Sequence, residues 1–68
     1  MTGTIRLNGV EAPAAETVAA LVARLGIAAD ARGIAVALNG AVVPRSAWAG
    51  TPLGPGDAVE VIRAVSGG

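Results

Sequence analysis

The final five residues, Ala64 to Gly68, carry the group in this chain whose chemistry is easiest to define. A strand-like run from Ala58 to Val65 leads into Ser66 and then into Gly67 and Gly68. Because glycine has no Cβ, both glycines accept any backbone conformation and fit a slot little wider than a main chain. The Gly68 α-carboxylate is a poor electrophile, but attachment of a phosphate of ATP converts it to an acyl adenylate, an acyl donor. We therefore expect the domain to present this carboxylate to a partner enzyme; the alternative is an accidental glycine-rich chain end.

Side chains suited to autonomous catalysis are scarce. The chain has no cysteine, histidine or lysine, and five arginines balance five acids to a formal net charge of zero. This composition excludes disulfides, thiol and imidazole catalysis, Schiff bases and the usual soft metal sites. The acids show no paired spacing that favours general acid–base work. We expect no enzyme activity, no catalytic residue and no bound metal or cofactor, and the absence of a basic patch argues against nucleic acid as a partner.

Length and hydropathy predict one small soluble domain over residues 1–68. Hydrophobic residues make up 53% of the 68 residues, yet Trp48 is the single aromatic one, so the core should be aliphatic. Residues 1–9 contain no apolar run typical of a signal peptide, and no later stretch is long enough to cross a bilayer. We expect a cytoplasmic protein that is a monomer on its own and does not contact membranes.

Two hairpins and one helix are predicted from local patterns. Thr4–Leu7 alternates polar and apolar residues, with Ile5 and Leu7 facing inward, and Asn8-Gly9 then favours a tight hairpin. A short return strand over Val10–Ala12 would end at Pro13. A second hairpin is expected from a strand over Ile34–Leu38, the turn Asn39-Gly40 and a return over Ala41–Val43 that ends at Pro44.

The helix has the clearest signals in the chain. Thr17 is a good N-cap, and Val18, Leu21, Val22 and Leu25 follow at helical spacing as one apolar stripe. Gly26 is placed to be the left-handed residue after the last turn, which would bring Ile27 against Val22 in a Schellman arrangement.

The last third of the chain leads from Trp48 into the final strand. Arg45–Ala49 could form one helical turn around Trp48, whose ring we expect to plug one end of the core rather than to bind a partner. Arg45 would pair with Asp57 or Glu60, or be solvated or contact a partner. A tight turn over Gly54–Asp57 precedes the strand, in which Asp57 would be a turn residue. Strand parity then places Val59 and Val61 inward.

On the opposite face of that strand lie Glu60 and Ile62. Ile62, together with Ala64 and the alanines of the third strand, could form an exposed patch that partner enzymes bind, with Glu60 beside it. The alternative is that Ile62 packs at the edge of the sheet. Overall, the order of elements predicts an α+β domain with one sheet covered on one face by one helix.

These residues resemble the ThiS family, the sulfur carrier proteins of thiamine (thiazole) biosynthesis. The resemblance covers nearly the whole chain and rests on the order and spacing of Asn8-Gly9, Val36-Ala37-Leu38-Asn39-Gly40, Val42-Val43-Pro44-Arg45, Trp48, Thr51-Pro52-Leu53, Gly56-Asp57, Val59-Glu60-Val61, Ala64-Val65 and Gly67-Gly68. It implies a ubiquitin-like β-grasp fold: a mixed sheet of four to five strands, a parallel central pair formed by the first and last strands, and a flexible tail over residues 64–68.

The resemblance also implies a sulfur-transfer mechanism. A ThiF-type adenylating enzyme would use Mg-ATP to adenylate the Gly68 carboxylate, while Val65, Ser66 and Gly67 thread its active site. Sulfur derived from a cysteine desulfurase would displace AMP to leave a thiocarboxylate. Thiazole synthase, of the ThiG type, would then receive the sulfur. The absence of cysteine is consistent with this scheme, because a persulfide carrier needs a thiol of its own.

Two other functions remain open at this point. The sulfur carrier subunit of molybdopterin synthase is also a β-grasp protein that ends in Gly-Gly, but that family tends to carry an aromatic-Pro-Pro run that residues 63–66 do not resemble. A ubiquitin-like protein modifier or plain interaction module is the other alternative. The absence of lysine argues against chains built on the protein itself, but single attachment to other proteins stays open.

Overall fold

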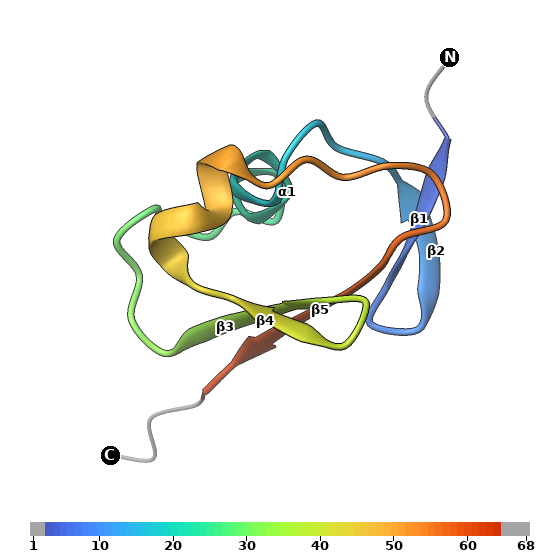
Figure 1. Ribbon diagram of the computed structural model, residues 1–68. Coiled ribbons are helices and arrows are strands. Elements are labelled where there is room, and N and C mark those ends of the chain that lie inside the picture. Colours follow the sequence, from blue (N-terminus) through green and yellow to red (C-terminus); the bar gives the residue numbers. More distant parts are fainter. Residues whose placement is uncertain (1–2, 65–68) are drawn as a thin grey trace.

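One sheet of five strands forms the centre of the computed structural model, which describes residues 3–64. The strands are β1 (Thr4–Leu7), β2 (Val10–Pro13), β3 (Ile34–Leu38), β4 (Ala41–Val43) and β5 (Ala58–Arg63). They lie in the order β2-β1-β5-β3-β4, and β1 and β5 pair in parallel whereas the other neighbours are antiparallel. Helix α1 (Val18–Arg24) lies on one side of this sheet (Figure 1). This arrangement is the ubiquitin-like β-grasp fold, so the predicted fold and its parallel central pair are confirmed.

Both hairpins form at the predicted Asn-Gly turns. Asn8 and Asn39 each adopt a left-handed φ of 51°, and the glycines that follow have φ of 83° and 87°. Two successive residues with positive φ are what the tight turn between twisted strands requires. The first return strand extends one residue further than expected, through Pro13, which pairs with Thr4 at the end of an edge strand where its missing N–H costs little.

Helix α1 begins and ends at the predicted signals. The Thr17 hydroxyl accepts a hydrogen bond from the Ala20 N–H at 3.1 Å, and Gly26 has a φ of 80°. The Ile27 N–H donates to the Val22 carbonyl at 3.3 Å, which completes the Schellman arrangement. The predicted stripe is wrong at Leu25, which is 40% exposed. The helix ends at Arg24, so Leu25 lies past its last turn, and Ile27 packs into the core in its place.

The core is aliphatic apart from one indole ring. Nine side chains are buried among residues 3–64: Ile5, Val18, Leu21, Val22, Ile27, Val36, Val43, Trp48 and Val59. Leu7, also predicted to face inward, is partly buried and packs against them. Trp48 comes from a 3-10 helix, η1 (Arg45–Gly50), which is the helical turn expected here, and its Nε1–H donates to the Val43 carbonyl at 2.9 Å. Because the ring is buried and its polar atom is satisfied, Trp48 is the structural plug that we expected.

The turn before β5 fixes where that strand starts. Gly56 has a φ of 85°, and its N–H donates to the Thr4 carbonyl at 2.9 Å. Asp57 is a turn residue, as predicted: one carboxylate oxygen accepts the Gly54 N–H at 2.8 Å, and the other accepts the Asn39 side-chain amide at 3.1 Å. These two hydrogen bonds stabilise the ionised carboxylate and hold the pKa of Asp57 below its ordinary value.

Strand β5 is shorter than the sequence predicted. Among the described residues it ends at Arg63, so Ala64 is not part of the strand, although Ala64 still donates its N–H to the Gly33 carbonyl at 2.7 Å. Val65 and the residues after it lie outside the described residues. The core strand that leads toward the tail is thus held between β1 and β3 and ends beside Gly33.

Candidate functional site: the open sheet face and the base of the tail

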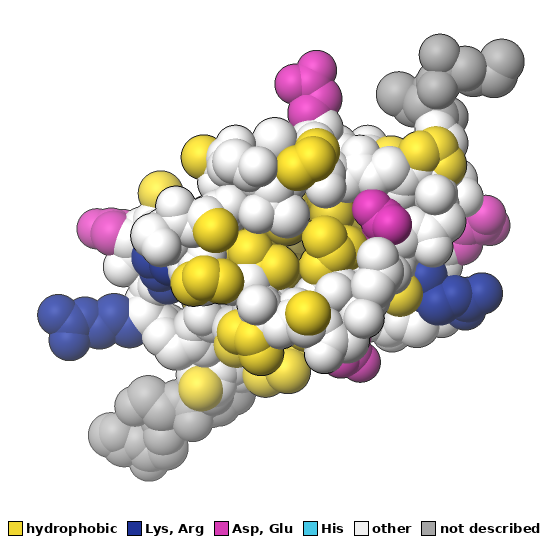
Figure 2. Space-filling view, viewed as in Figure 1, with side chains coloured by type: hydrophobic (Ala, Val, Ile, Leu, Met, Phe, Trp, Pro, Cys, Tyr) yellow, Lys and Arg dark blue, Asp and Glu magenta, His cyan; other side chains and the backbone are white. Residues whose placement is uncertain are grey.

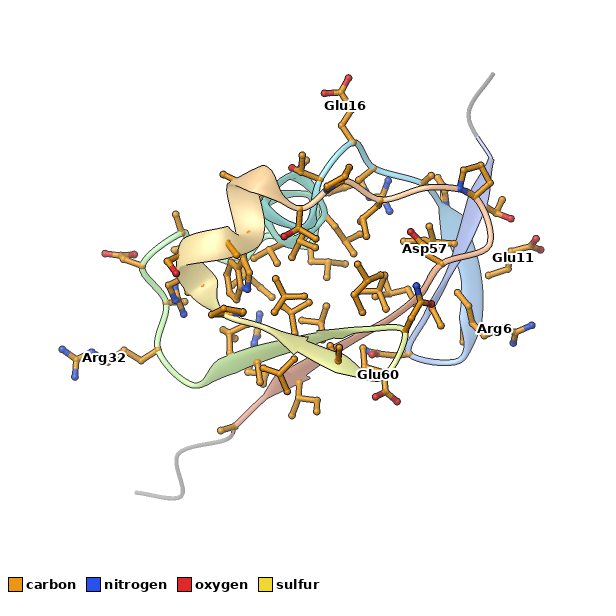
Figure 3. All side chains as sticks on the ribbon, viewed as in Figure 1. Arg6, Glu11, Glu16, Arg32, Asp57 and Glu60 are labelled. Carbon is orange, nitrogen blue, oxygen red and sulfur yellow. The ribbon has the colours of Figure 1, made fainter. Side chains whose placement is uncertain are left out.

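Strand β5 presents alternate side chains to the two faces of the sheet, as its parity predicted. Val59 is fully buried and Val61 is partly buried on the helix side. Glu60 is exposed, and Figure 3 shows its side chain pointing away from the helix. Ile62, on the same face as Glu60, is 57% exposed. The face without a helix is therefore open around the last strand before the tail.

Apolar side chains from three neighbouring strands meet on this open face. The register places Ile62 of β5 beside Ala35 of β3, and it places Ala37 of β3 beside Val42 of β4. We call Ile62, Ala35, Ala37 and Val42 the open-face patch. Figure 2 shows hydrophobic side chains gathered in the middle of the view and continuing to its lower edge. The open-face patch is therefore the candidate interaction surface of the described residues.

The predicted exposure of this surface is confirmed, whereas its role in binding partners stays a prediction. Ile62 and Ala35 are exposed as expected, and they do not pack under another element at the sheet edge. Ala64 is exposed too and follows Ile62 at the next position of the same parity. Val42, which is 76% exposed, was not singled out, although the burial of its neighbour Val43 requires it to face outward.

The base of the tail is packed against a loop, residues 28–33. Gly33 at the end of this loop has a φ of 74°, and its carbonyl accepts the Ala64 N–H at 2.7 Å. A Cβ on Gly33 would lie 3.3 Å from the Ala64 carbonyl oxygen and 3.4 Å from its Cβ. The position therefore favours glycine for its backbone conformation and for the space it leaves.

Arg45 holds the same loop, so the prediction that it pairs with Asp57 or Glu60 is wrong. Its guanidinium donates to the carbonyls of Ala29 and Ala31 and lies 4.7 Å from the centre of the Trp48 ring. The reason is the placement of η1, which begins at Arg45 and brings its side chain over the loop rather than toward β5. Arg45 is therefore an exposed side chain whose hydrogen bonds hold the loop.

Two asparagines bind β5 in a way that the sequence did not reveal. The Asn8 side chain accepts from the Val61 N–H at 2.9 Å and donates to the Val61 carbonyl at 3.2 Å. Its amide thus takes the place of the next β1 residue in the ladder. Asn39, which follows β3, contacts the start of β5 in a similar way: its side-chain oxygen accepts a hydrogen bond from the Ala58 N–H at 2.9 Å. The sequence marks both residues only as turn formers, because a side-chain hydrogen bond across 53 residues, such as that between Asn8 and Val61, leaves no local signal.

The remaining predicted site residues, Val65, Ser66, Gly67 and Gly68, lie outside the described residues, so their roles stay predictions. Within residues 3–64, no group of three or more acidic, histidine or cysteine side chains could hold a metal ion. No helix in the same residues is long and apolar enough to cross a membrane.

Comparisons with known proteins give a consistent result. The model of the ThiS family matches residues 3–68, which includes the tail. A crystal structure of the thiamine biosynthesis protein (ThiS) from Geobacter metallireducens is similar to this chain, with 35% sequence identity and a TM-score of 0.75. The similarity covers 96% of this chain and 99% of the Geobacter chain. Among curated proteins, none matches the sequence.

Proposed function

The chain belongs to the ThiS family, the small sulfur carriers of thiamine biosynthesis, and we propose that it carries sulfur on the C-terminal carboxylate of Gly68. The carboxylate oxygen attacks the α-phosphate of Mg-ATP in a ThiF-type enzyme, and pyrophosphate leaves. The terminal sulfur of a persulfide derived from cysteine through a desulfurase then attacks the acyl carbon and expels AMP, and a thiol of the donor system cleaves the S–S bond of the acyl disulfide and is itself oxidised to a disulfide. The resulting thiocarboxylate donates its sulfur to thiazole synthase, so the protein acts as a co-substrate and not as a catalyst.

The observation that carries this proposal is the extent of the family match together with the composition of the chain. The match runs to Gly68, and no cysteine is present anywhere in the 68 residues to hold sulfur as a persulfide. A carrier of this composition needs another group that can be activated, and a carboxylate becomes an acyl donor once it is adenylated. Val65, Ser66 and Gly67 would occupy the channel that leads to the nucleotide, where the missing Cβ of glycine admits a narrow passage.

The open-face patch is the surface that we propose the partner enzymes bind. It lies on the face without a helix, and it includes Ile62, two residues before the base of the tail. Docking on this face would bring the tail to the same enzyme surface. Glu60, exposed beside the patch, would lie at the polar edge of the contact, and Ala64 would lie between the patch and the tail.

Deletion of Gly68 tests the proposal in cells that lack their own carrier of this family. The truncated chain should fail to support growth without added thiamine, because the carboxylate would end one residue short of the nucleotide. The matched control is Glu16→Gln, since Glu16 points away from the sheet on the helix side (Figure 3) and should support full growth. Full growth of the truncated strain, with the protein present at wild-type level, would contradict the proposal.

A further inference from the structure

The loop over residues 28–33 is tied to the molecule at both ends, and one end is the base of the tail. Arg45 holds the carbonyls of Ala29 and Ala31, whereas Gly33 holds the Ala64 N–H. Between these contacts, Ala31 is partly buried against the core. The loop therefore connects Arg45, which lies over the core residue Trp48, to Ala64, the residue that precedes the tail.

The Arg45 end of this link is strong for an exposed side chain. Two N–H groups of one guanidinium reach two backbone carbonyls, and hydrogen bonds from an ionised donor are stronger than neutral ones. The guanidinium also lies over Trp48, a favourable contact between a cation and an aromatic face. Trp48 is 5% exposed and anchored to the Val43 carbonyl, so Arg45 rests on a fixed platform.

The Gly33 end leaves little freedom to Ala64. The hydrogen bond of 2.7 Å fixes the Ala64 amide, and the Gly33 Cα approaches Ala64 so closely that an added Cβ would lie 3.3 Å from its carbonyl oxygen. This bond continues the β3–β5 ladder one residue beyond Ile34 and Arg63. Ala64 is thus held by the loop after β5 has formally ended.

We propose that Arg45 and Gly33 are positioning residues that fix the base of the tail, so that the Gly68 carboxylate enters the activating enzyme from one set point. The inference rests on the proposed function. Four residues follow Ala64 in the 68-residue chain, and four extended residues span roughly 13–14 Å at most. With so short a reach, displacement of Ala64 by a few ångströms changes whether the carboxylate arrives at the nucleotide. A base that is fixed before docking also lowers the ordering cost of binding.

The test uses the full chain and two readouts. The first is amide hydrogen exchange at Ala64, with the core amide of Val59 as the internal reference for global opening. The second is kcat/KM for adenylation by a ThiF-type enzyme with Mg-ATP. Arg45→Ala should speed exchange at Ala64 by about tenfold relative to Val59 and lower kcat/KM by about tenfold, corresponding to loss of one or two charge-assisted hydrogen bonds. Arg45→Lys keeps the charge but loses the planar guanidinium, so both readouts for this variant should lie between those of the wild type and those of Arg45→Ala.

Two further variants make the result independent of how Arg45→Ala folds. Gly33→Ala perturbs the other end of the loop without touching Trp48 and should produce the same paired change. Arg32→Ala is the matched control, because it removes an exposed arginine from the same loop, at a side chain that points into solvent (Figure 3), and both readouts should keep their wild-type values.

The outcomes separate this inference from the proposed function. If the wild-type chain is adenylated but Arg45→Ala and Gly33→Ala retain wild-type kcat/KM or wild-type exchange at Ala64, the positioning role is refuted. If the wild-type chain is never adenylated, the proposed function is refuted together with everything that depends on it.

Discussion

Replacing Ile62 with aspartate should separate binding to the partner enzyme from folding of the carrier. Ile62 is 57% exposed, and its neighbour across the β3–β5 ladder is the small residue Ala35. The side chain therefore contributes little to the core. Substitutions at such surface positions usually change stability by about 0.5 kcal/mol or less, with strand propensity adding up to about 1 kcal/mol. The free energy of unfolding should fall by about 1 kcal/mol at most.

The expected loss of affinity is larger and follows from the exposed area. Burying a whole isoleucine side chain is worth about 1.5–3 kcal/mol, so the 57% of Ile62 that is exposed offers about 1–2 kcal/mol to a partner. An aspartate at the same position adds an unpaired carboxylate to a dry contact, which costs about 1–3 kcal/mol more. The sum of about 2–5 kcal/mol corresponds to roughly 30- to 4,000-fold weaker binding.

The assay is the KM of the carrier for adenylation by a ThiF-type enzyme, measured beside urea unfolding. Val10→Asp is the matched control: Val10 is 68% exposed, but it lies outside the open-face patch on edge strand β2, which β1 separates from β5 and Ile62. This control should leave KM unchanged. A KM for Ile62→Asp equal to that of the wild type, or an equal loss in both variants, would refute the docking surface.

Two further predictions concern the contacts that hold β5 and its turn. Asn8→Gly keeps the left-handed turn but removes two hydrogen bonds to Val61, so it should lower the free energy of unfolding by about 1–2 kcal/mol in urea. Asn8→Ala should lose about 1 kcal/mol more, because alanine resists a φ of 51°; equal stability of both variants and the wild type would contradict this account. The pKa of Asp57 is lowered in the folded state by hydrogen bonds from Gly54 and Asn39. Its contribution to stability is therefore complete above the ordinary pKa of about 3.9 and is lost as the pH falls through the lower folded value. Asp57→Asn should show a shallower loss of stability in that acid range, measured as the urea midpoint against pH, and superimposable profiles would count against the hydrogen bonds.

The features that could be predicted from the sequence are those with local causes. Thr17 and Gly26 mark the helix ends because capping depends on a few adjacent residues, and the Asn-Gly turns follow from the φ that each turn requires. The outward position of Ile62 follows from strand parity alone. Strand order had no local signal, and the parallel pairing of β1 with β5 came from the resemblance.

The features that could not be predicted depend on contacts between distant segments. The hydrogen-bond partners of Arg45 are backbone carbonyls in a loop whose path depends on the whole fold, and pairing with Asp57 or Glu60, one of the alternatives left open by the sequence, does not occur. Leu25 fits the helical stripe by spacing, but the helix ends at Arg24 and the chain reverses at Gly26. Leu25 therefore stays exposed, and Ile27 packs into the core instead. The Asn8 bonds to Val61 join segments that only the folded sheet brings together.

The central claim is that sulfur is carried on the carboxylate of Gly68. Its most direct test is the intact mass of the wild-type chain after incubation with a ThiF-type enzyme, Mg-ATP and a sulfur donor, followed by fragmentation to locate the change. We predict a gain equal to replacement of one oxygen by sulfur, located on Gly68. An unchanged chain, sulfur at another residue, or linkage of Gly68 to lysines of other proteins would contradict it.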